Sequence, residues 1–191
     1  MKIIIVLRNP VDRAYSNYLH AVRLLSEPLS FEQAIVYEPY RKKMNYAWPF
    51  LYVEAGMYYQ PVKHYVTSFS HVKIFMYEDL AKETFLTELF DFLEVDRVQL
   101  DIFCKHNVST IPKHPWLSKF LLSMSKSKLN RLLLPIKLKQ CVGGALEIVN
   151  TCKPPQLQKE TRLYLQTVFK NDMESLQQLI KRDISAWING E

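Results

Sequence analysis

The sequence predicts an α/β fold in which a parallel sheet is flanked by helices. Two apolar runs, at 2–8 and 71–80, are typical of buried strands with their exit turns. A helical pattern follows each run, and the connection between the two strands is far longer than a hairpin loop. Strands that alternate with helices in this way pair in parallel, and the helices cover the sheet.

The first strand, 2–8, runs directly into a helix that we predict over 10–26. Apolar residues recur along this helix at helical spacing: Ala14, Tyr18, Ala21, Val22 and Leu25. Ser30 and Gln33 form a capping-box pattern that predicts a short helix after it. Residues 38–55 are expected to form a long irregular loop. Its basic and aromatic side chains either face a sugar or aromatic acceptor or fold onto the surface.

The rest of the chain carries three further helical patterns. One runs from Gly56 to Phe69, and another spans about 83–94 after the second strand. The last begins near Pro155, and Trp187 behind it is expected to pack back on the domain. With 191 residues and 48% hydrophobic content, we expect a single domain over 1–191.

The net charge of +6 suits an anionic ligand, a nucleic acid or an acidic membrane surface. No apolar run reaches the roughly 18 residues of a membrane span, and Arg8 interrupts the N-terminal run too early for a signal peptide. We therefore expect a cytoplasmic protein, or a Golgi-lumen protein if the chain is part of a longer eukaryotic one.

The chain contains three widely spaced cysteines: Cys104, Cys141 and Cys152. They form no metal-binding spacing, so no metal is expected. Free thiols in a reducing compartment are the simplest interpretation, and a Cys141–Cys152 bridge is the alternative in an oxidising one. The sequon at Asn107 matters only in a secreted chain.

Arg8 and Ser16 are the candidate binding residues. Arg8 ends the first strand, and ligands of open α/β sheets bind at the carboxyl ends of the strands. Its guanidinium is a planar fork of donors that suits a phosphate, and Ser16 lies about two turns into the next helix. The pattern indicates either a phosphate clamp or an ordinary strand–helix junction with an exposed arginine.

This segment resembles the 3′-phosphate-binding motif of sulfotransferases that use 3′-phosphoadenosine 5′-phosphosulfate (PAPS). In that family the strand ends in Arg, a turn with Pro follows, and a Ser comes eight positions after the Arg. Arg8, Pro10, Asp12 and Ser16 match this pattern. The resemblance implies a P-loop-NTPase-like parallel sheet with flanking helices. It also implies that Arg8 and Ser16 bind the 3′-phosphate of PAPS, the cosubstrate.

Two further segments carry the same resemblance. Tyr77 and the residues after it match the end of the family's next strand, which implies a place for Tyr77 near the adenine. The alternative for Tyr77 is a core tyrosine that closes the strand. The Gly56–Tyr58 pattern and the segment 154–187 are similar to bacterial and heparan-type sulfotransferases. This branch favours a saccharide among the hydroxyl or amine acceptors.

Two features of the family have no counterpart in this sequence. The family's 5′-phosphosulfate loop and its Glu or His base precede the Arg8 motif, and the glycines at 56, 143, 144 and 190 cannot form a Gly-rich loop. We therefore expect a domain that lacks the 5′-phosphosulfate loop, with a sheet that is incomplete on its N-terminal side and an exposed apolar edge. No catalytic residue is assigned, and the histidines at 20, 64 and 71 are expected at the surface.

Residues 105–139 are basic and contain no Asp or Glu. Three interpretations are open: a cationic wall around a nucleotide, a basic amphipathic helix on an acidic membrane surface, or a surface helix with an apolar core side. In related enzymes a Lys/Arg- and Gly-containing loop closes over the cofactor. Lys139, Gly143, Gly144 and Lys153 lie about where it would be.

The sequence thus favours a PAPS-dependent sulfotransferase domain whose partners are the nucleotide cosubstrate and a small-molecule acceptor. The first alternative is a non-catalytic remnant or binding module that keeps the 3′-phosphate half-site. The second is a basic protein that contacts a membrane surface through 105–139. Nucleic acid is not expected as a partner, because nucleic-acid binding leaves the spacing of Arg8 and Ser16 unexplained.

Overall fold

The computed structural model describes residues 1–98, 110–119 and 150–189. At its centre, β1 (Lys2–Leu7) and β2 (His71–Met76) pair in parallel. Their register places Leu7 opposite Met76, so both strands end at the same edge of the sheet. A parallel pair with a long crossover confirms the predicted α/β fold class.

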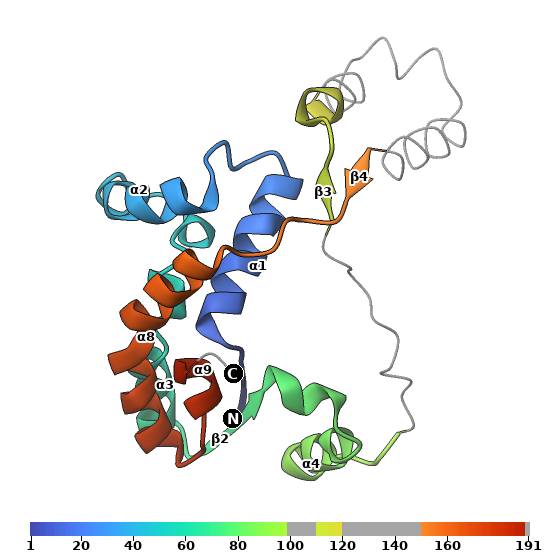
Figure 1. Ribbon diagram of the computed structural model, residues 1–191. Coiled ribbons are helices and arrows are strands. Elements are labelled where there is room, and N and C mark those ends of the chain that lie inside the picture. The colour runs from blue at the N-terminus through green and yellow to red at the C-terminus, as the bar shows by residue number, and fades with distance from the viewer. Residues whose placement is uncertain (99–109, 120–149, 190–191) are drawn as a thin grey trace, which may run out of the picture.

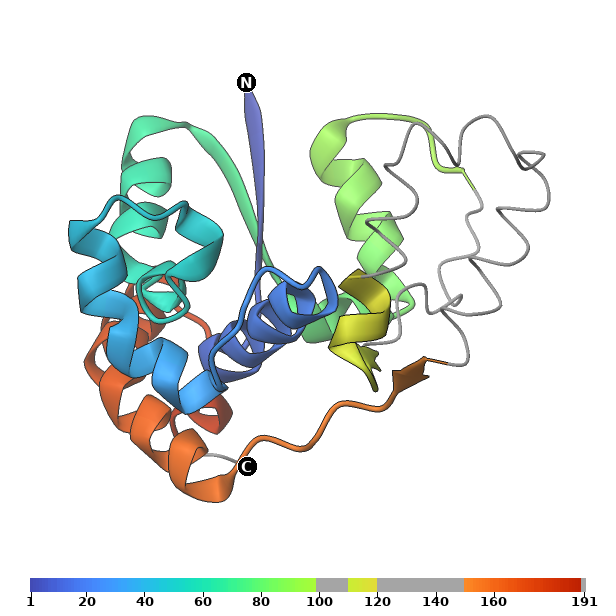
Figure 2. The same ribbon diagram turned by 90° about the horizontal axis from the view of Figure 1, so that it is seen from above.

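Helices cover both sides of these strands. In chain order the helices named here are α1 (Pro10–Arg23), α2 (Phe31–Lys43), α3 (Tyr59–Ser68), α4 (Thr84–Leu93), α8 (Lys159–Ile180) and α9 (Ser185–Asn189). In Figure 1, α3, α8 and α9 lie on one side of the strands and α4 lies on the other. Seen from above in Figure 2, α2, α3 and α8 lie to one side of α1 and α4 lies to the other.

Within the described residues, β2 is the strand that pairs with β1, and the other edge of β1 carries no strand. Ile4 is 39% exposed and Val6 is 48% exposed. An exposed apolar strand of this kind agrees with the sequence-based expectation of an uncovered sheet edge.

The core forms where α8 crosses α1 and α3. Four side chains along α8 are almost completely buried: Leu165, Phe169, Met173 and Leu176. Trp187 in α9 is buried against the same cluster. The predicted return of Trp187 onto the domain is thereby confirmed. The helix starts at Lys159, four residues after Pro155.

Helix α1 ends at Arg23, three residues before the predicted end. Leu25 adopts a left-handed conformation with φ 57°. The amide of Ser26 then donates to the Ala21 carbonyl at 3.0 Å, and that of Leu25 donates to the Val22 carbonyl at 2.9 Å. This is the hydrogen-bonding pattern of a Schellman motif. This motif usually has glycine at its left-handed position. A leucine at position 25 therefore gives no sequence signal that the helix ends here.

The prediction of an irregular loop over 38–55 is wrong for its first part, because α2 continues through Pro39 to Lys43. A proline inside a helix removes one backbone hydrogen bond. Tertiary contacts on the inner face of the helix compensate: the Glu38 carboxylate accepts hydrogen bonds from the amides of Val53 and Glu54, at 2.8 and 2.7 Å. The chain then forms two short 3₁₀-helices, η1 (Trp48–Phe50) and η2 (Glu54–Gly56). The predicted capping box of Ser30 and Gln33 is confirmed.

A buried ion pair fixes α2 to the end of α1. The Arg41 guanidinium donates to both carboxylate oxygens of Glu27, at 2.7 and 2.8 Å, and the Tyr52 hydroxyl donates to Glu27 at 2.7 Å. Burial opposes ionisation of Glu27, but the hydrogen bonds from Arg41 and Tyr52 outweigh it and lower the Glu27 pKa. The side chains of Glu27, Arg41 and Tyr52 therefore bind one another and stabilise the fold.

A small antiparallel pair, β3 (Ile111–Pro112) and β4 (Thr151–Cys152), lies beside α1 and has no counterpart in the sequence predictions. The buried Asn150 accepts a hydrogen bond from the His114 amide at 3.0 Å and donates one to the Ser118 hydroxyl at 2.8 Å. Cys152 is a free thiol. Cys104, Cys141 and Asn107 lie outside the described residues.

Across the three described ranges, no helix combines the length and the apolar character that a membrane crossing requires.

Candidate functional site

Arg8 lies at the carboxyl end of β1, where the chain turns into α1. Asn9 makes this turn: its side-chain oxygen accepts a hydrogen bond from the Val11 amide at 3.0 Å and so caps α1. Pro10 occupies the first turn, where its missing N–H costs nothing. The strand, the cap and the proline together place Arg8 beside a helix N-terminus, which favours negative charge.

The register of the sheet brings Tyr77 next to Arg8. Since Leu7 pairs with Met76, the residues that follow them leave the sheet side by side. Tyr77 opens the 3₁₀-helix η3 (Tyr77–Ala81), and its ring centroid lies 4.9 Å from the Arg8 guanidinium carbon. Tyr77 is 49% exposed, so it is not a core tyrosine.

The Arg8 guanidinium has no carboxylate partner among the described residues, and none of its N–H groups donates a hydrogen bond to them. The half-buried side chain lies against the Tyr77 ring. The Arg8 backbone is fixed separately, because its carbonyl accepts a hydrogen bond from the Tyr58 hydroxyl at 3.0 Å. An arginine with an anchored backbone and unused donors is equipped to bind an anion.

Ser16 lies in α1 about two turns after Pro10. Hydroxyls within helices commonly donate to the carbonyl four residues earlier, as those of Thr67, Thr167 and Ser175 do here. The Ser16 hydroxyl makes no hydrogen bond to any described residue. It is half-buried and remains available to a ligand.

Asp12, the other polar residue of the motif, is already engaged. Its carboxylate pairs with Arg162 of α8 at 2.7 Å. Asp12 thus connects α1 to the last long helix, and it does not leave a negative charge free near Arg8.

The segment Gly56–Tyr58 supports the Arg8 backbone, because the Tyr58 hydroxyl donates to the Arg8 carbonyl. A Cβ on Gly56 would lie 2.7 Å from a ring carbon of Phe169, so only glycine fits here. The Asp172 carboxylate accepts hydrogen bonds from the backbone amides of Tyr58 and Tyr59, at 2.7 and 3.1 Å, and so fixes the start of α3. The sequence pattern marked Gly56 and Tyr58, but nothing in it indicated that Asp172 closes this turn from α8.

Arg13 lies beneath the same turn. Its guanidinium donates to the Tyr52 carbonyl at 2.5 Å, and its Nε is buried with no hydrogen-bond partner among the described atoms. Burial raises the pKa of the Tyr58 hydroxyl to about 12, although the Arg13 and Arg8 cations act in the opposite direction. Tyr58 therefore stays protonated at neutral pH and can donate to the Arg8 carbonyl.

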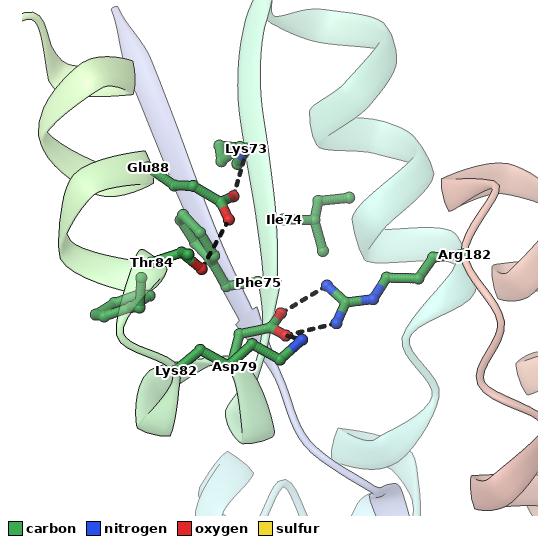
Figure 3. A pocket seen from close by; sticks show the side chains of 9 residues that line it. Lys73, Ile74, Phe75, Asp79, Lys82, Thr84, Glu88 and Arg182 are labelled. Carbon is green, nitrogen blue, oxygen red and sulfur yellow. Dashed lines mark hydrogen bonds and ion pairs between the residues drawn. The ribbon is translucent and has the colours of Figure 1, made fainter.

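A cavity of about 220 Å³ lies between β2, α4 and the end of α8, on a separate part of η3 (Figure 3). Its lining carries three cations, Lys73, Lys82 and Arg182, and two carboxylates, Asp79 and Glu88. Asp79 accepts two hydrogen bonds from Arg182, both at 2.6 Å, and Lys73 pairs with Glu88 at 3.1 Å. The hydrogen bonds from Arg182 are the main cause of the strongly lowered pKa of Asp79, and burial of the carboxylate acts against it. Ion pairs engage both carboxylates of this cavity, and its three cations leave the lining with a net charge of +1.

Two of the described histidines, His20 and His71, lie away from Arg8. His20 follows Pro10 by ten residues of helix, roughly 15 Å along α1, and His71 begins β2 at the opposite end of the strand from Tyr77. Both are exposed, as is His64. The described residues contain no group of three or more His, Cys, Asp or Glu that could hold a metal ion.

Most of the basic segment 105–139 lies outside the described residues, and so do Lys139, Gly143 and Gly144. Lys153 is described and exposed, with no salt bridge to any described carboxylate. The three interpretations of the segment therefore stay predictions.

Comparisons with known proteins agree with this geometry. A family model of the sulfotransferase domain matches residues 1–133. The structure is similar to the crystal structure of a sulfotransferase from Alicyclobacillus acidocaldarius, with a TM-score of 0.67 and 26% sequence identity. This similarity covers 97% of the chain but only 57% of that bacterial protein. No match was found among curated proteins.

Proposed function

Since this chain belongs to the sulfotransferase domain family, we propose that it serves the transfer of a sulfuryl group from PAPS to a hydroxyl or amine acceptor. In this proposal Arg8 and Ser16 bind the 3′-phosphate of the nucleotide. The observation that carries it is the unpaired Arg8 guanidinium at the carboxyl end of a parallel strand, beside a helix N-terminus and ahead of an unused serine hydroxyl.

The proposed roles follow from the chemistry of the side chains. Arg8 supplies charge-assisted hydrogen bonds to the phosphate oxygens, and Ser16 donates one neutral hydrogen bond. Tyr77 is the proposed neighbour of the adenine, because its half-exposed ring offers a flat apolar surface with a polar tip. These residues bind and orient the nucleotide, and orientation is a large part of catalysis in an in-line displacement.

In the transfer itself, the acceptor oxygen or nitrogen forms a bond to sulfur while the bond from sulfur to the 5′-phosphate oxygen breaks. The products are the sulfated acceptor and adenosine 3′,5′-bisphosphate, and the acceptor proton goes to a base. No residue of the chain is assigned as that base. A saccharide acceptor is proposed from the likeness to the bacterial and heparan-type branch.

The test is calorimetric titration with adenosine 3′,5′-bisphosphate, with adenosine 5′-monophosphate as the control that lacks the 3′-phosphate. Replacing Arg8 by Ala removes charge-assisted hydrogen bonds worth about 1.5–3 kcal/mol, a loss of roughly 10- to 150-fold in affinity. Ser16→Ala should weaken binding by a smaller factor. Arg23→Ala, at the other end of α1, is the matched control and should bind like the wild type. Equal affinities of wild type and Arg8→Ala for the bisphosphate would contradict the assignment.

A non-catalytic binding module is the second candidate, because the glycines of the sequence, at 56, 143, 144 and 190, do not have the spacing of a Gly-rich phosphate loop. A transfer assay with radiolabelled PAPS and a panel of saccharides separates the two candidates. Transfer above background supports the enzyme. Bisphosphate binding that depends on Arg8, without transfer, supports the module.

Membrane contact through the basic segment 105–139 stays a separate prediction. Co-sedimentation with vesicles that contain anionic lipid, compared with neutral vesicles, tests it. Binding that falls as salt rises would support a surface electrostatic contact.

A further inference from the structure

We propose that Tyr77 is a positioning residue for the anion site: its ring holds the Arg8 guanidinium in place and leaves every N–H donor free for the phosphate. The inference rests on the proposed function and refines it, since it gives Tyr77 a role that acts through Arg8 and is separate from any contact with the adenine.

The contact is built into the sheet. Leu7 and Met76 are paired in β1 and β2, so Arg8 and Tyr77 emerge from adjacent strands at one edge. The 4.9 Å separation between the guanidinium carbon and the ring centroid is typical of a cation–π pair. Within the described residues the Arg8 guanidinium makes no hydrogen bond and no salt bridge, so we infer that the ring orients the side chain.

An aromatic ring suits this task better than a carboxylate would. A carboxylate would occupy two guanidinium donors and cancel the positive charge, as Asp79 does with Arg182 a short distance away on η3. A ring attracts the cation through its π face and uses no N–H group. Arg8 therefore meets a phosphate already oriented, and less rotamer freedom is lost when the phosphate binds.

Both ends of the contact are anchored in the fold. On the Arg8 side, the Tyr58 hydroxyl fixes the backbone carbonyl at 3.0 Å. On the Tyr77 side, η3 is held because the Asp79 carboxylate accepts a hydrogen bond from the Met76 amide at 2.7 Å. The ring therefore projects from a fixed turn toward an arginine whose backbone is also fixed.

The test is a double-mutant cycle with adenosine 3′,5′-bisphosphate as the titrated ligand. Tyr77→Leu removes the ring and should weaken binding roughly two- to fivefold, whereas Tyr77→Phe keeps the π face and should largely restore affinity. In an Arg8→Ala background the part of the Tyr77→Leu effect that acts through Arg8 should disappear, so the loss of bisphosphate affinity should be smaller than in the wild-type background. Tyr37→Leu, on the distant α2, is the control for losing an exposed tyrosine and should bind like the wild type.

The cycle separates positioning from adenine contact. A ring that only touched the adenine would weaken adenosine 5′-monophosphate as much as the bisphosphate, and would do so equally with Ala at position 8. Either result overturns the positioning role. If instead Arg8→Ala leaves bisphosphate affinity unchanged, the proposed function fails.

If the proposed function fails in this way, the positioning role can still be tested without any nucleotide. The measurement is ¹⁵N relaxation of the Arg8 Nε–H group in the free protein. This group should be ordered in the wild type and in Tyr77→Phe, and mobile in Tyr77→Leu. Equal mobility of the group in all three proteins would refute the inference whatever the ligand.

Discussion

Arg8 and Arg182 both lie against η3, but they are held in opposite ways. Arg182 reaches η3 from the end of α8 and forms two hydrogen bonds with the Asp79 carboxylate, which Lys82 also contacts at 2.9 Å. Arg8 reaches the first residue of η3, where it meets only the ring of Tyr77. One short 3₁₀-helix therefore holds one arginine that is neutralised and one that is not.

The difference teaches how structural and binding arginines can be told apart. A carboxylate fixes an arginine and uses up its charge, so Arg182 joins the C-terminal region to the sheet edge and has little left for a ligand. A ring fixes an arginine and leaves its charge and donors intact. The surroundings of each guanidinium, more than its position near the sheet edge, indicate its role.

The largest expected effect comes from removing the carboxylate that neutralises Arg182. Asp79→Asn should lower the free energy of unfolding by about 3 kcal/mol, since it removes the carboxylate that pairs with a half-buried arginine and weakens the bond to the Met76 amide. Urea denaturation measures the change. Glu88→Gln is the matched control in the same cavity, because its pair with Lys73 is exposed and should contribute less than about 1 kcal/mol.

The same comparison predicts that the contribution of Asp79 to stability falls at acid pH. The pKa of Asp79 is lower in the folded protein than in the unfolded chain, so its contribution is complete above the unfolded pKa near 4 and is lost as pH falls below it. The stability difference between wild type and Asp79→Asn should therefore shrink below about pH 4. A difference that stays constant from pH 7 to pH 3 would mean that the ion pair with Arg182 contributes nothing to stability.

The stability of the protein at alkaline pH tests the role of the buried Tyr58 hydroxyl, which donates to the Arg8 carbonyl. The folded pKa of Tyr58, about 12, lies above that of an unfolded tyrosine, near 10. The tyrosine of the unfolded chain therefore loses its proton first, and stability should fall by about 2 kcal/mol as pH rises from 10 to 12. Tyr58→Phe should lack this component. Parallel unfolding curves for the two proteins at pH 9 and pH 11.5 would show it, and an identical pH dependence would contradict the buried role of the hydroxyl.

A substitution at Gly56 tests whether the segment Gly56–Tyr58, which supports the Arg8 backbone, depends on close packing. Gly56→Ala places a methyl group 2.7 Å from a Phe169 ring carbon and should cost about 1–3 kcal/mol of stability. Phe169→Leu should recover part of this loss when combined with Gly56→Ala, because the clash is with the ring. Additive effects of the two substitutions in urea denaturation would exclude the clash as the cause.

The smallest expected effect on stability belongs to Arg8 itself. Arg8→Ala removes one cation–π contact at a half-exposed ring and should change the free energy of unfolding by less than about 1 kcal/mol. The same substitution should nevertheless cause the large loss in bisphosphate affinity described above. A destabilisation as large as that of Asp79→Asn would remove the distinction between the two arginines.

Local patterns in the sequence predicted much of this structure. The strand at 2–7 contains the β-branched residues 3–6, and Asn9 and Pro10 start α1 as their capping preferences indicate. The capping box at Ser30 and the strand at 71–76 were predicted for similar local reasons. The place of Arg8 at the strand end follows directly from these signals.

Predictions failed where tertiary contacts overrode a local signal. Pro39 indicated a break, but buried partners of Glu38 and Arg41 keep α2 intact around it. The chain also has left-handed residues at Leu25, Asn45, Glu94 and Lys181, which end helices without glycine. With only four glycines in the sequence, these turns are set by packing and carry little composition signal.

The α/β class, the strand–turn–helix that carries Arg8 and Ser16, and the family to which the motif belongs could all be predicted from the sequence, because each depends on residues close together in the chain. Which charges are paired could be seen only in the folded chain. Strand register places Tyr77 on Arg8. Asp172 and Arg162 of α8, and Arg182 just after it, lie more than 70 residues away in the chain from the turns and carboxylates that they contact. Pairing of charges depends on distances between segments remote in sequence, and those distances exist only once the chain has folded.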